Sequence, residues 1–133
     1  ILDFRVYVNG EFLNASRADG IILSTPTGST GYSLSVGGPI VSPEASLILI
    51  SHIAPHTLNN RSIVLPEDAR ITVEAALGHT GAGEGAEVVF DGDTSVHLDV
   101  GDTVEIRKSS KVTRLLKINN ISFLEVLRKK MNG

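Results

Sequence analysis

Residues 24–38 read "STPTGSTGYSLSVGG", and eight of these fifteen residues carry a hydroxyl group while four are glycine. None of the fifteen is charged. The apolar run 21–23 before the segment predicts a buried strand, and residues 32–36 predict a short helix that Gly37, Gly38 and Pro39 end. The segment is therefore predicted to be a strand-to-helix turn with backbone N–H groups open to a ligand.

The hydroxyl groups of this segment suit a neutral polar ligand. A hydroxyl donates and accepts, so it can bind amide, ribose and phosphate groups without adding charge. The phosphate-loop pattern fails because no lysine follows Gly31, and the glycine spacing of the dinucleotide fingerprint is missing. The run 31–35, "GYSLS", starts like a hydrolase nucleophile turn but has Ser35 where the second glycine belongs. From the residues alone, a ligand loop and a plain structural turn both remain open.

The composition predicts one folded domain. A chain of 133 residues suits a single core, and 41% hydrophobic with 20% charged residues is typical of globular proteins. No apolar run approaches the ~20 residues of a membrane span, and the first residues, "ILDFRVYV", do not resemble a signal peptide. With no cysteine in the chain, we expect a cytoplasmic protein without a membrane partner.

Charge is distributed unevenly along the chain. Residues 1–105 carry 14 acidic and four Lys or Arg side chains, whereas residues 106–133 carry eight Lys or Arg and one acidic side chain. A basic end can attract nucleic acid, but the only aromatic residue there is Phe123, which weakens single-strand stacking. We expect a solvated strand and helix, with no nucleic-acid partner.

The remaining sequence predicts a mainly β fold of the β-sandwich type, with a short helix after the hydroxyl-rich segment and a C-terminal helix. Alternation over residues 3–8 and the Asn9-Gly10 pair predict a hairpin that returns from residue 11. Further strands are predicted at 47–50, 63–65, 70–77, 87–90, 95–100, 103–107 and 112–118. The glycine-rich run 78–87 predicts a mobile loop, and Ser122 with Glu125 has the spacing of a helix capping box.

The histidines do not predict a metal site. His52 and His56 have the i, i+4 spacing of a zinc-binding helix, but Pro55 lies between them and the glutamate of that motif is absent. We therefore expect no metal ligands in this chain.

A family resemblance covers nearly the whole chain. "RADGIILSTPTGSTGYSLSVGGPIVSP" (17–43) resembles the signature of the NAD kinase family, and "PHTLNNRSIVLP" (55–66) and "VVFDGD" (88–93) fall where later segments of that family do. The resemblance implies that residues 1–133 are the C-terminal, β-rich, NAD-binding and oligomerising domain. The family's Gly-Gly-Asp-Gly-Thr motif is not in this sequence, so its catalytic aspartate is expected in an N-terminal α/β domain upstream of Ile1. No catalytic residue is expected in this chain.

The resemblance also implies an activity and a site. Family members transfer a phosphoryl group from ATP, or in some members polyphosphate, to the adenosine-ribose 2′-hydroxyl of NAD, assisted by Mg²⁺ or another divalent ion, and assemble as dimers or tetramers. The implied NAD contacts are Arg17, Asp19, Thr27, Thr30, Gly31, Tyr32, Ser33, Ser35, Ala54 and Asp93. Of these, Asp19 and Ala54 are expected to reach the dinucleotide across a subunit boundary, and many relatives have glutamine at the position of Asp93.

Two other functions remain open at this point. One is a non-catalytic module that binds NAD or NADH or only joins subunits. The other is a domain of a related lipid kinase, which shares the general architecture, although "STPTGSTGY" (24–32) argues against it. The residues of this chain do not indicate the phosphoryl donor.

Overall fold

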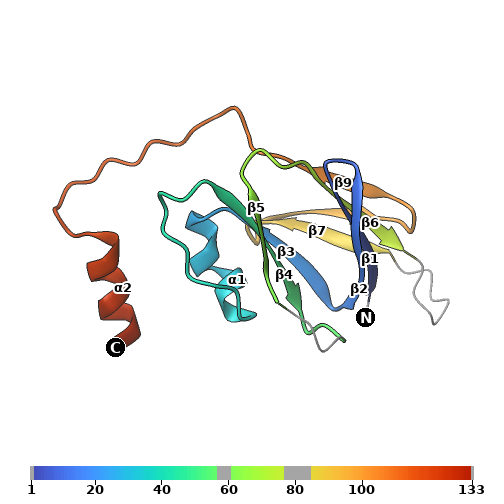
Figure 1. Ribbon diagram of the computed structural model, residues 1–133, viewed down its shortest axis with the longest axis horizontal. Coiled ribbons are helices and arrows are strands. Elements are labelled where there is room, and N and C mark those ends of the chain that lie inside the picture. Colours follow the sequence, from blue (N-terminus) through green and yellow to red (C-terminus); the bar gives the residue numbers. More distant parts are fainter. Residues whose placement is uncertain (1, 57–60, 77–84, 133) are drawn as a thin grey trace.

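The computed structural model describes residues 2–56, 61–76 and 85–132, and its fold is mainly β, as predicted (Figure 1). The strands are β1 (Leu2–Val8), β2 (Glu11–Ala18), β3 (Gly20–Ser24), β4 (Leu47–Ile53), β5 (Ile63–Pro66), β6 (Ile71–Ala76), β7 (Ala86–Phe90), β8 (Thr94–Leu98) and β9 (Thr103–Ile106). The helical elements are the 3-10 turn η1 (Thr27–Thr30), α1 (Tyr32–Ser35) and α2 (Phe123–Asn132). The pairings between these strands are antiparallel.

The first sheet has the strand order β2-β1-β6-β9. Its β1–β2 hairpin turns at Asn9 and Gly10, whose φ angles of 51° and 82° are the pair that a tight right-twisted hairpin needs. The predicted hairpin is confirmed. Asn9 also ties the turn to the next strand, because its backbone N–H donates to the carbonyl of Arg70 at 2.8 Å.

The second sheet has the order β3-β4-β5. The chain passes from the first sheet to the second through the single residue Asp19, between the end of β2 and Gly20, the first residue of β3. The predicted strands 21–23, 47–50 and 63–65 are confirmed as strands, and the second continues to Ile53. Burial is confirmed for the second only, because the first is half-buried and Val64 of the third is 55% exposed. The two sheets therefore follow each other with almost no connecting loop.

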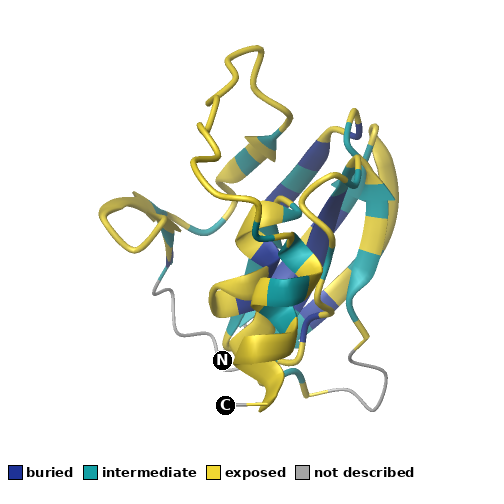
Figure 2. Cartoon of the chain, turned by 90° about the vertical axis from the view of Figure 1, so that its left-hand side faces the viewer, coloured by how far each residue is buried: buried dark blue, intermediate teal, exposed yellow. Residues whose placement is uncertain are grey.

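The core lies between these two sheets. Phe4, Val6, Ile71 and Val73 of the first sheet form one buried cluster with Ile48 and Ile50 of the second. Each such side chain contributes roughly 1.5–3 kcal/mol when it is fully buried. Figure 2 shows buried residues along the strands of the sheets, and this arrangement of two sheets around one core is the predicted sandwich.

The β7–β8 hairpin lies largely outside this core. Only its base is buried, where Ala86 pairs with Leu98 and both pack against the cluster. The predicted strand 95–100 is confirmed only as far as Leu98, and Val96 on it is 50% exposed, because no layer of the described residues covers that part of the hairpin. Most of the predicted loop 78–87 lies outside the described residues, but its last two residues belong to β7.

The C-terminal segment departs most from prediction. Residues 112–118 form no strand and are exposed throughout, since no neighbouring strand offers them hydrogen bonds. The predicted helix that follows is confirmed as α2, and the backbone N–H of Glu125 donates to Ser122 Oγ at 3.1 Å. No residue of α2 is buried. Figure 1 shows this segment running away from the sheets, and across the described residues no helix is long and apolar enough to cross a membrane.

Candidate functional site

The hydroxyl-rich segment covers the outer face of the second sheet. Along β4, Ile48 and Ile50 point into the core, so by the two-residue period of a strand Leu49 and Ser51 point to the other face. Both are buried there, at 0% and 2% exposure. Helix α1 and the turn η1 contact the neighbouring strand β3, and Figure 1 shows α1 beside β3 and β4. The segment therefore forms a third layer over the sandwich.

Ser29 anchors the first half of this layer. Its side chain is fully buried, and its Oγ donates to the carbonyl oxygen of Pro26 at 2.7 Å. Ser29 Oγ also accepts a hydrogen bond from the backbone N–H of Val41 at 3.2 Å. One serine thus closes the 3-10 turn and joins it to the chain that leaves α1.

Ser33 anchors the second half. It is 1% exposed, and its Oγ lies 3.4 Å from Ser51 Oγ, which lies 2.8 Å from Ser62 Oγ. The backbone N–H of Gly38 donates to the Ser33 carbonyl oxygen at 2.8 Å. A Cβ at Gly38 would lie 2.6 Å from that oxygen, so the close approach requires glycine at this position.

The opposite face of the segment is open to solvent. Five of the predicted NAD contacts are exposed on it: Thr27, Thr30, Gly31, Tyr32 and Ser35. Tyr32 is 60% exposed. By contrast Ser33, the sixth predicted contact in this segment, turns its hydroxyl inward, which leaves only its backbone for a ligand. The segment thus has a buried face that holds it and an exposed face of hydroxyl groups.

A buried hydroxyl without a partner lies at the start of the segment. Ser24 Oγ is buried and forms no hydrogen bond within the part of the chain that the structure describes. Such groups are rare in folded proteins because each costs free energy. Ser24 is the last residue of β3, three positions before the first residue of η1.

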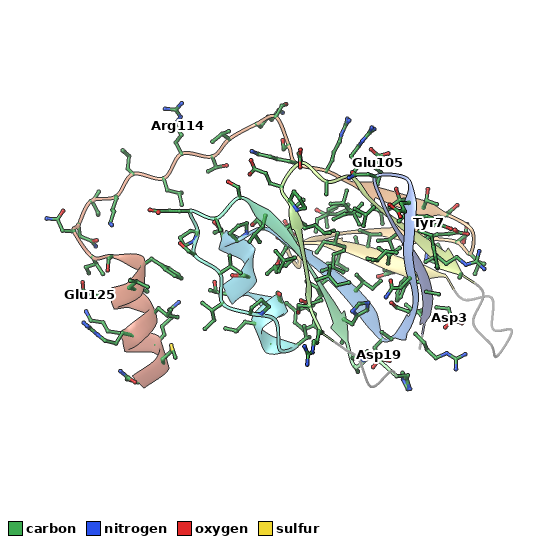
Figure 3. The ribbon with its side chains drawn as sticks, viewed as in Figure 1. Asp3, Tyr7, Asp19, Glu105, Arg114 and Glu125 are labelled. Carbon is green, nitrogen blue, oxygen red and sulfur yellow. The ribbon has the colours of Figure 1, made fainter. Side chains whose placement is uncertain are left out.

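A second group of predicted residues is brought together where the sheets meet. The backbone N–H of Asp19 donates to the carbonyl of Ile53 at 2.9 Å, and that of His56 donates to the carbonyl of Arg17 at 3.0 Å. Ala54 lies between these two bonds with φ of 45°, a conformation that costs a non-glycine residue on the order of 1–3 kcal/mol. Figure 3 shows Asp19 at this end of the sheets.

Arg17 and Asp3 form an ion pair beside this group. Arg17 Nε lies 3.2 Å from Asp3 Oδ1, and the two side chains are 37% and 19% exposed. The pair fixes the direction of the guanidinium group on the first sheet.

No local sequence pattern indicates the contact between Ser16 and His52. Ser16 Oγ lies 3.0 Å from His52 Nε2, and burial lowers the pKa of His52 from its ordinary value of 6.5. The two residues are 36 positions apart on different sheets, so no local pattern could have paired them. Ser16 is buried, and the contact joins the two sheets next to Arg17.

Asp93, the last predicted contact, lies on a different element from both groups. It belongs to the turn of the β7–β8 hairpin, where its backbone N–H donates to the carbonyl of Phe90 at 3.0 Å. The turn residues Asp91 and Gly92 have φ of 50° and 75°. Within residues 2–56, 61–76 and 85–132, no three His, Cys, Asp or Glu side chains are grouped so that they could hold a metal ion.

These features define a class of protein: a two-sheet β domain with an uncharged, hydroxyl-rich loop on its outer face. The particular family follows from comparison with known proteins. The chain belongs to the ATP-NAD kinase C-terminal domain family, whose model matches residues 1–118.

Curated proteins that are similar to the chain are named NAD kinase. It is 50% identical over 133 residues to the NAD kinase of Agathobacter rectalis, covering 100% of this chain and 47% of that protein. It is 45% identical over 140 residues to the NAD kinase of Lachnospira eligens, covering 98% of this chain and 48% of that protein. The chain therefore spans about half the length of these relatives.

Solved structures agree in fold. Yeast NADH kinase complexed with NADH superposes with a TM-score of 0.70 at 38% identity, over 78% of this chain and 29% of that one. The Archaeoglobus fulgidus NAD kinase in complex with ATP gives a TM-score of 0.71 at 34% identity, over 82% of this chain and 40% of that one.

Proposed function

We propose that this chain is the NAD-binding and subunit-contacting part of a longer NAD kinase, which phosphorylates the adenosine-ribose 2′-hydroxyl of NAD to give NADP. The observation that carries the proposal is the exposed hydroxyl face of residues 27–35, held from behind by Ser29 and Ser33. The names of the relatives, and the NADH and ATP in the two solved structures, support it.

The chemistry assigned to this chain is positioning. Phosphoryl transfer depends on orienting the acceptor and neutralising the charge of the transferred group. An uncharged loop can hold NAD by hydrogen bonds from Thr27, Thr30, Tyr32 and Ser35, and by the backbone at Gly31. A fixed loop lowers the entropic cost of orienting the ribose hydroxyl toward the donor.

The donor and its ion are proposed to bind mainly outside this chain. ATP or polyphosphate is the proposed donor, with Mg²⁺ or another divalent ion. Among the described residues, no three His, Cys, Asp or Glu side chains lie close enough together to bind such an ion. The catalytic aspartate is proposed to lie in an N-terminal α/β domain of the longer protein.

The second group of residues is proposed to complete the site in an assembly. Arg17, Asp19 and Ala54 lie together at one end of the sheets, and we propose that Asp19 and Ala54 reach NAD bound to a neighbouring subunit of a dimer or tetramer. Asp93 is proposed to contact NAD from the β7–β8 turn. Exposed apolar side chains such as Val64 and Phe90, at 55% and 53% exposure, support an assembly in which part of this surface is covered. A cytoplasmic location, without nucleic-acid or membrane partners, completes the proposal.

The test uses the full-length protein with NAD, ATP or polyphosphate, and Mg²⁺, and measures NADP formation. Tyr32→Phe should raise the KM for NAD about threefold to tenfold, since one hydrogen bond is worth ~1 kcal/mol. Tyr7→Phe, at the other tyrosine of the chain, is the matched control and should change nothing. The isolated 133-residue chain should form no NADP. A full-length protein that leaves NAD unphosphorylated with both donors would overturn the proposal.

A further inference from the structure

Three serines form a line of hydroxyl groups between the hydroxyl-rich segment and the second sheet. We call Ser33, Ser51 and Ser62 the hydroxyl seam. Their Oγ atoms follow one another at 3.4 Å and 2.8 Å, and Ser33 and Ser51 are 1% and 2% exposed. The three residues come from α1, from β4 and from the chain just before β5.

The seam occupies a place where apolar side chains would usually pack. Leu49, two residues before Ser51 on the same face of β4, is fully buried by the same layer. A buried hydroxyl is tolerated only when it is hydrogen-bonded, and the direction of that bond then fixes the position of both partners. The seam therefore specifies where α1 sits on the sheet more narrowly than aliphatic contacts would.

Helix α1 depends on such contacts because it is only four residues long. A single helical turn is not stable by itself in water. Tyr32 and Ser35 sit on this turn, on either side of the buried Ser33. Any shift of Ser33 relative to the sheet therefore moves the exposed hydroxyl groups on both sides of it.

Ser51 is the central member of the seam. Its hydroxyl group is hydrogen-bonded to those of Ser33 and Ser62. Three residues further along the chain is Ala54, which belongs to the second group of predicted contacts. One side chain thus connects the hydroxyl-rich segment to the strand that carries the other half of the site.

We propose that Ser51 is a positioning residue for NAD: it never touches the dinucleotide but sets the placement of the hydroxyl face through Ser33. This inference rests on the proposed function. It assigns Ser62 a supporting role, because that hydroxyl orients Ser51.

The experiment measures KM for NAD, KM for ATP, kcat and Tm for full-length variants. Ser51→Ala should raise the KM for NAD about tenfold, leave the KM for ATP unchanged, and lower Tm. Ser62→Ala should raise the KM for NAD about threefold. In the double variant the two effects should not add, since both act through one chain of hydrogen bonds.

Two controls separate positioning from general destabilisation. Val73→Ala removes buried apolar volume from the first sheet, so it should lower Tm with an unchanged KM for NAD. Ser95→Ala, at an exposed serine of β8, should change neither value.

The outcomes are distinct. If Ser51→Ala keeps the wild-type KM for NAD while lowering Tm as Val73→Ala does, Ser51 is structural only and the inference is overturned. If Ser51→Ala fails to fold, Ser62→Ala is judged by the same criterion: a lowered Tm with the wild-type KM for NAD overturns the inference. If the wild-type protein neither binds nor phosphorylates NAD, the proposed function fails and the inference fails with it.

Discussion

The hydroxyl-rich segment 24–38 and the C-terminal segment 107–121 both contain little regular strand, but the first is packed against a sheet and the second is exposed. The first has no charged residue and only two aliphatic ones, and it is packed onto the second sheet. The second includes Leu115, Leu116 and Ile118, and these are 84%, 94% and 94% exposed. Figure 3 shows Arg114 projecting from this segment away from the sheets.

Apolar content alone therefore does not decide which segment packs, because a segment also needs directed hydrogen bonds and a surface to pack against. Ser29 and Ser33 give the polar segment directed hydrogen bonds to Pro26, Val41 and Ser51. The C-terminal segment has short-range bonds, such as the backbone N–H of Lys111 to Ser109 Oγ at 3.0 Å, and near its start an exposed ion pair, in which Lys108 Nζ lies 3.0 Å from Glu67 Oε1. Apolar side chains without a facing surface do not fold a segment.

The largest expected effect contrasts one leucine from each region. Leu49→Ala should lower the free energy of unfolding of the 133-residue chain by about 2–5 kcal/mol, because the side chain is fully buried under the hydroxyl-rich segment. Leu116→Ala should change it by less than about 0.5 kcal/mol. Urea unfolding followed by circular dichroism measures both. Equal effects at the two positions would remove the basis of the comparison.

The close approach of Gly38 to Ser33 predicts the next largest effect on stability. Gly38→Ala forces a Cβ against the Ser33 carbonyl and should cost about 1–3 kcal/mol. Gly28→Ala is the matched control, since a Cβ there meets its nearest neighbour, Thr25 Oγ1, at an ordinary 3.4 Å. Thermal unfolding of the two variants side by side measures the difference, and a fully tolerated alanine at Gly38 would mean that α1 is not held as described.

Replacing one threonine in each segment should have different effects on the affinity for NAD. Thr30→Ala, on the exposed face of the hydroxyl-rich segment, should weaken NAD binding to the full-length protein about threefold to tenfold through the loss of one hydrogen bond. Thr113→Ala, in the C-terminal segment, should leave affinity unchanged. Isothermal titration calorimetry with NAD gives both values, and an effect at Thr113 alone would reverse the assignment.

The smallest expected effect is on pH dependence. Burial lowers the pKa of His52 below 6.5, so the unfolded chain takes up a proton that the folded chain does not. The full stability is therefore present above about pH 6.5 and falls as the pH decreases from there toward the lowered folded-state pKa. Unfolding midpoints at about pH 7.5 and 5.5 should differ less in His52→Gln than in the wild type. Ser95→Ala, which removes no titratable group, is the control and should keep the wild-type difference.

The sequence predicted the parts of the fold that depend on neighbouring residues. The Asn9-Gly10 pair set its own hairpin, and Ser122 capped α2. The prediction of a strand over 112–118 was wrong because a run rich in apolar residues states only which side chains could be buried. It does not state that another strand lies alongside to complete the hydrogen bonds.

The site was predicted as a set of residues but not as an arrangement. The hydroxyl count marked the segment, yet it did not show that Ser33 faces inward while Tyr32 faces outward, because that depends on the layer beneath. The seam from Ser33 to Ser51 and the contact from Ser16 to His52 join residues 18 and 36 positions apart. Such pairings are set by packing of the two sheets and leave no local pattern in the sequence.

The most direct test of the account is backbone hydrogen exchange of the full-length protein with and without NAD. If residues 27–35 bind NAD, they should exchange more slowly on NAD addition, with residues 107–121 unchanged. Slower exchange confined to another surface, such as the polar depression lined by Asn9, Arg70 and Glu105, with residues 27–35 unaffected, would contradict it.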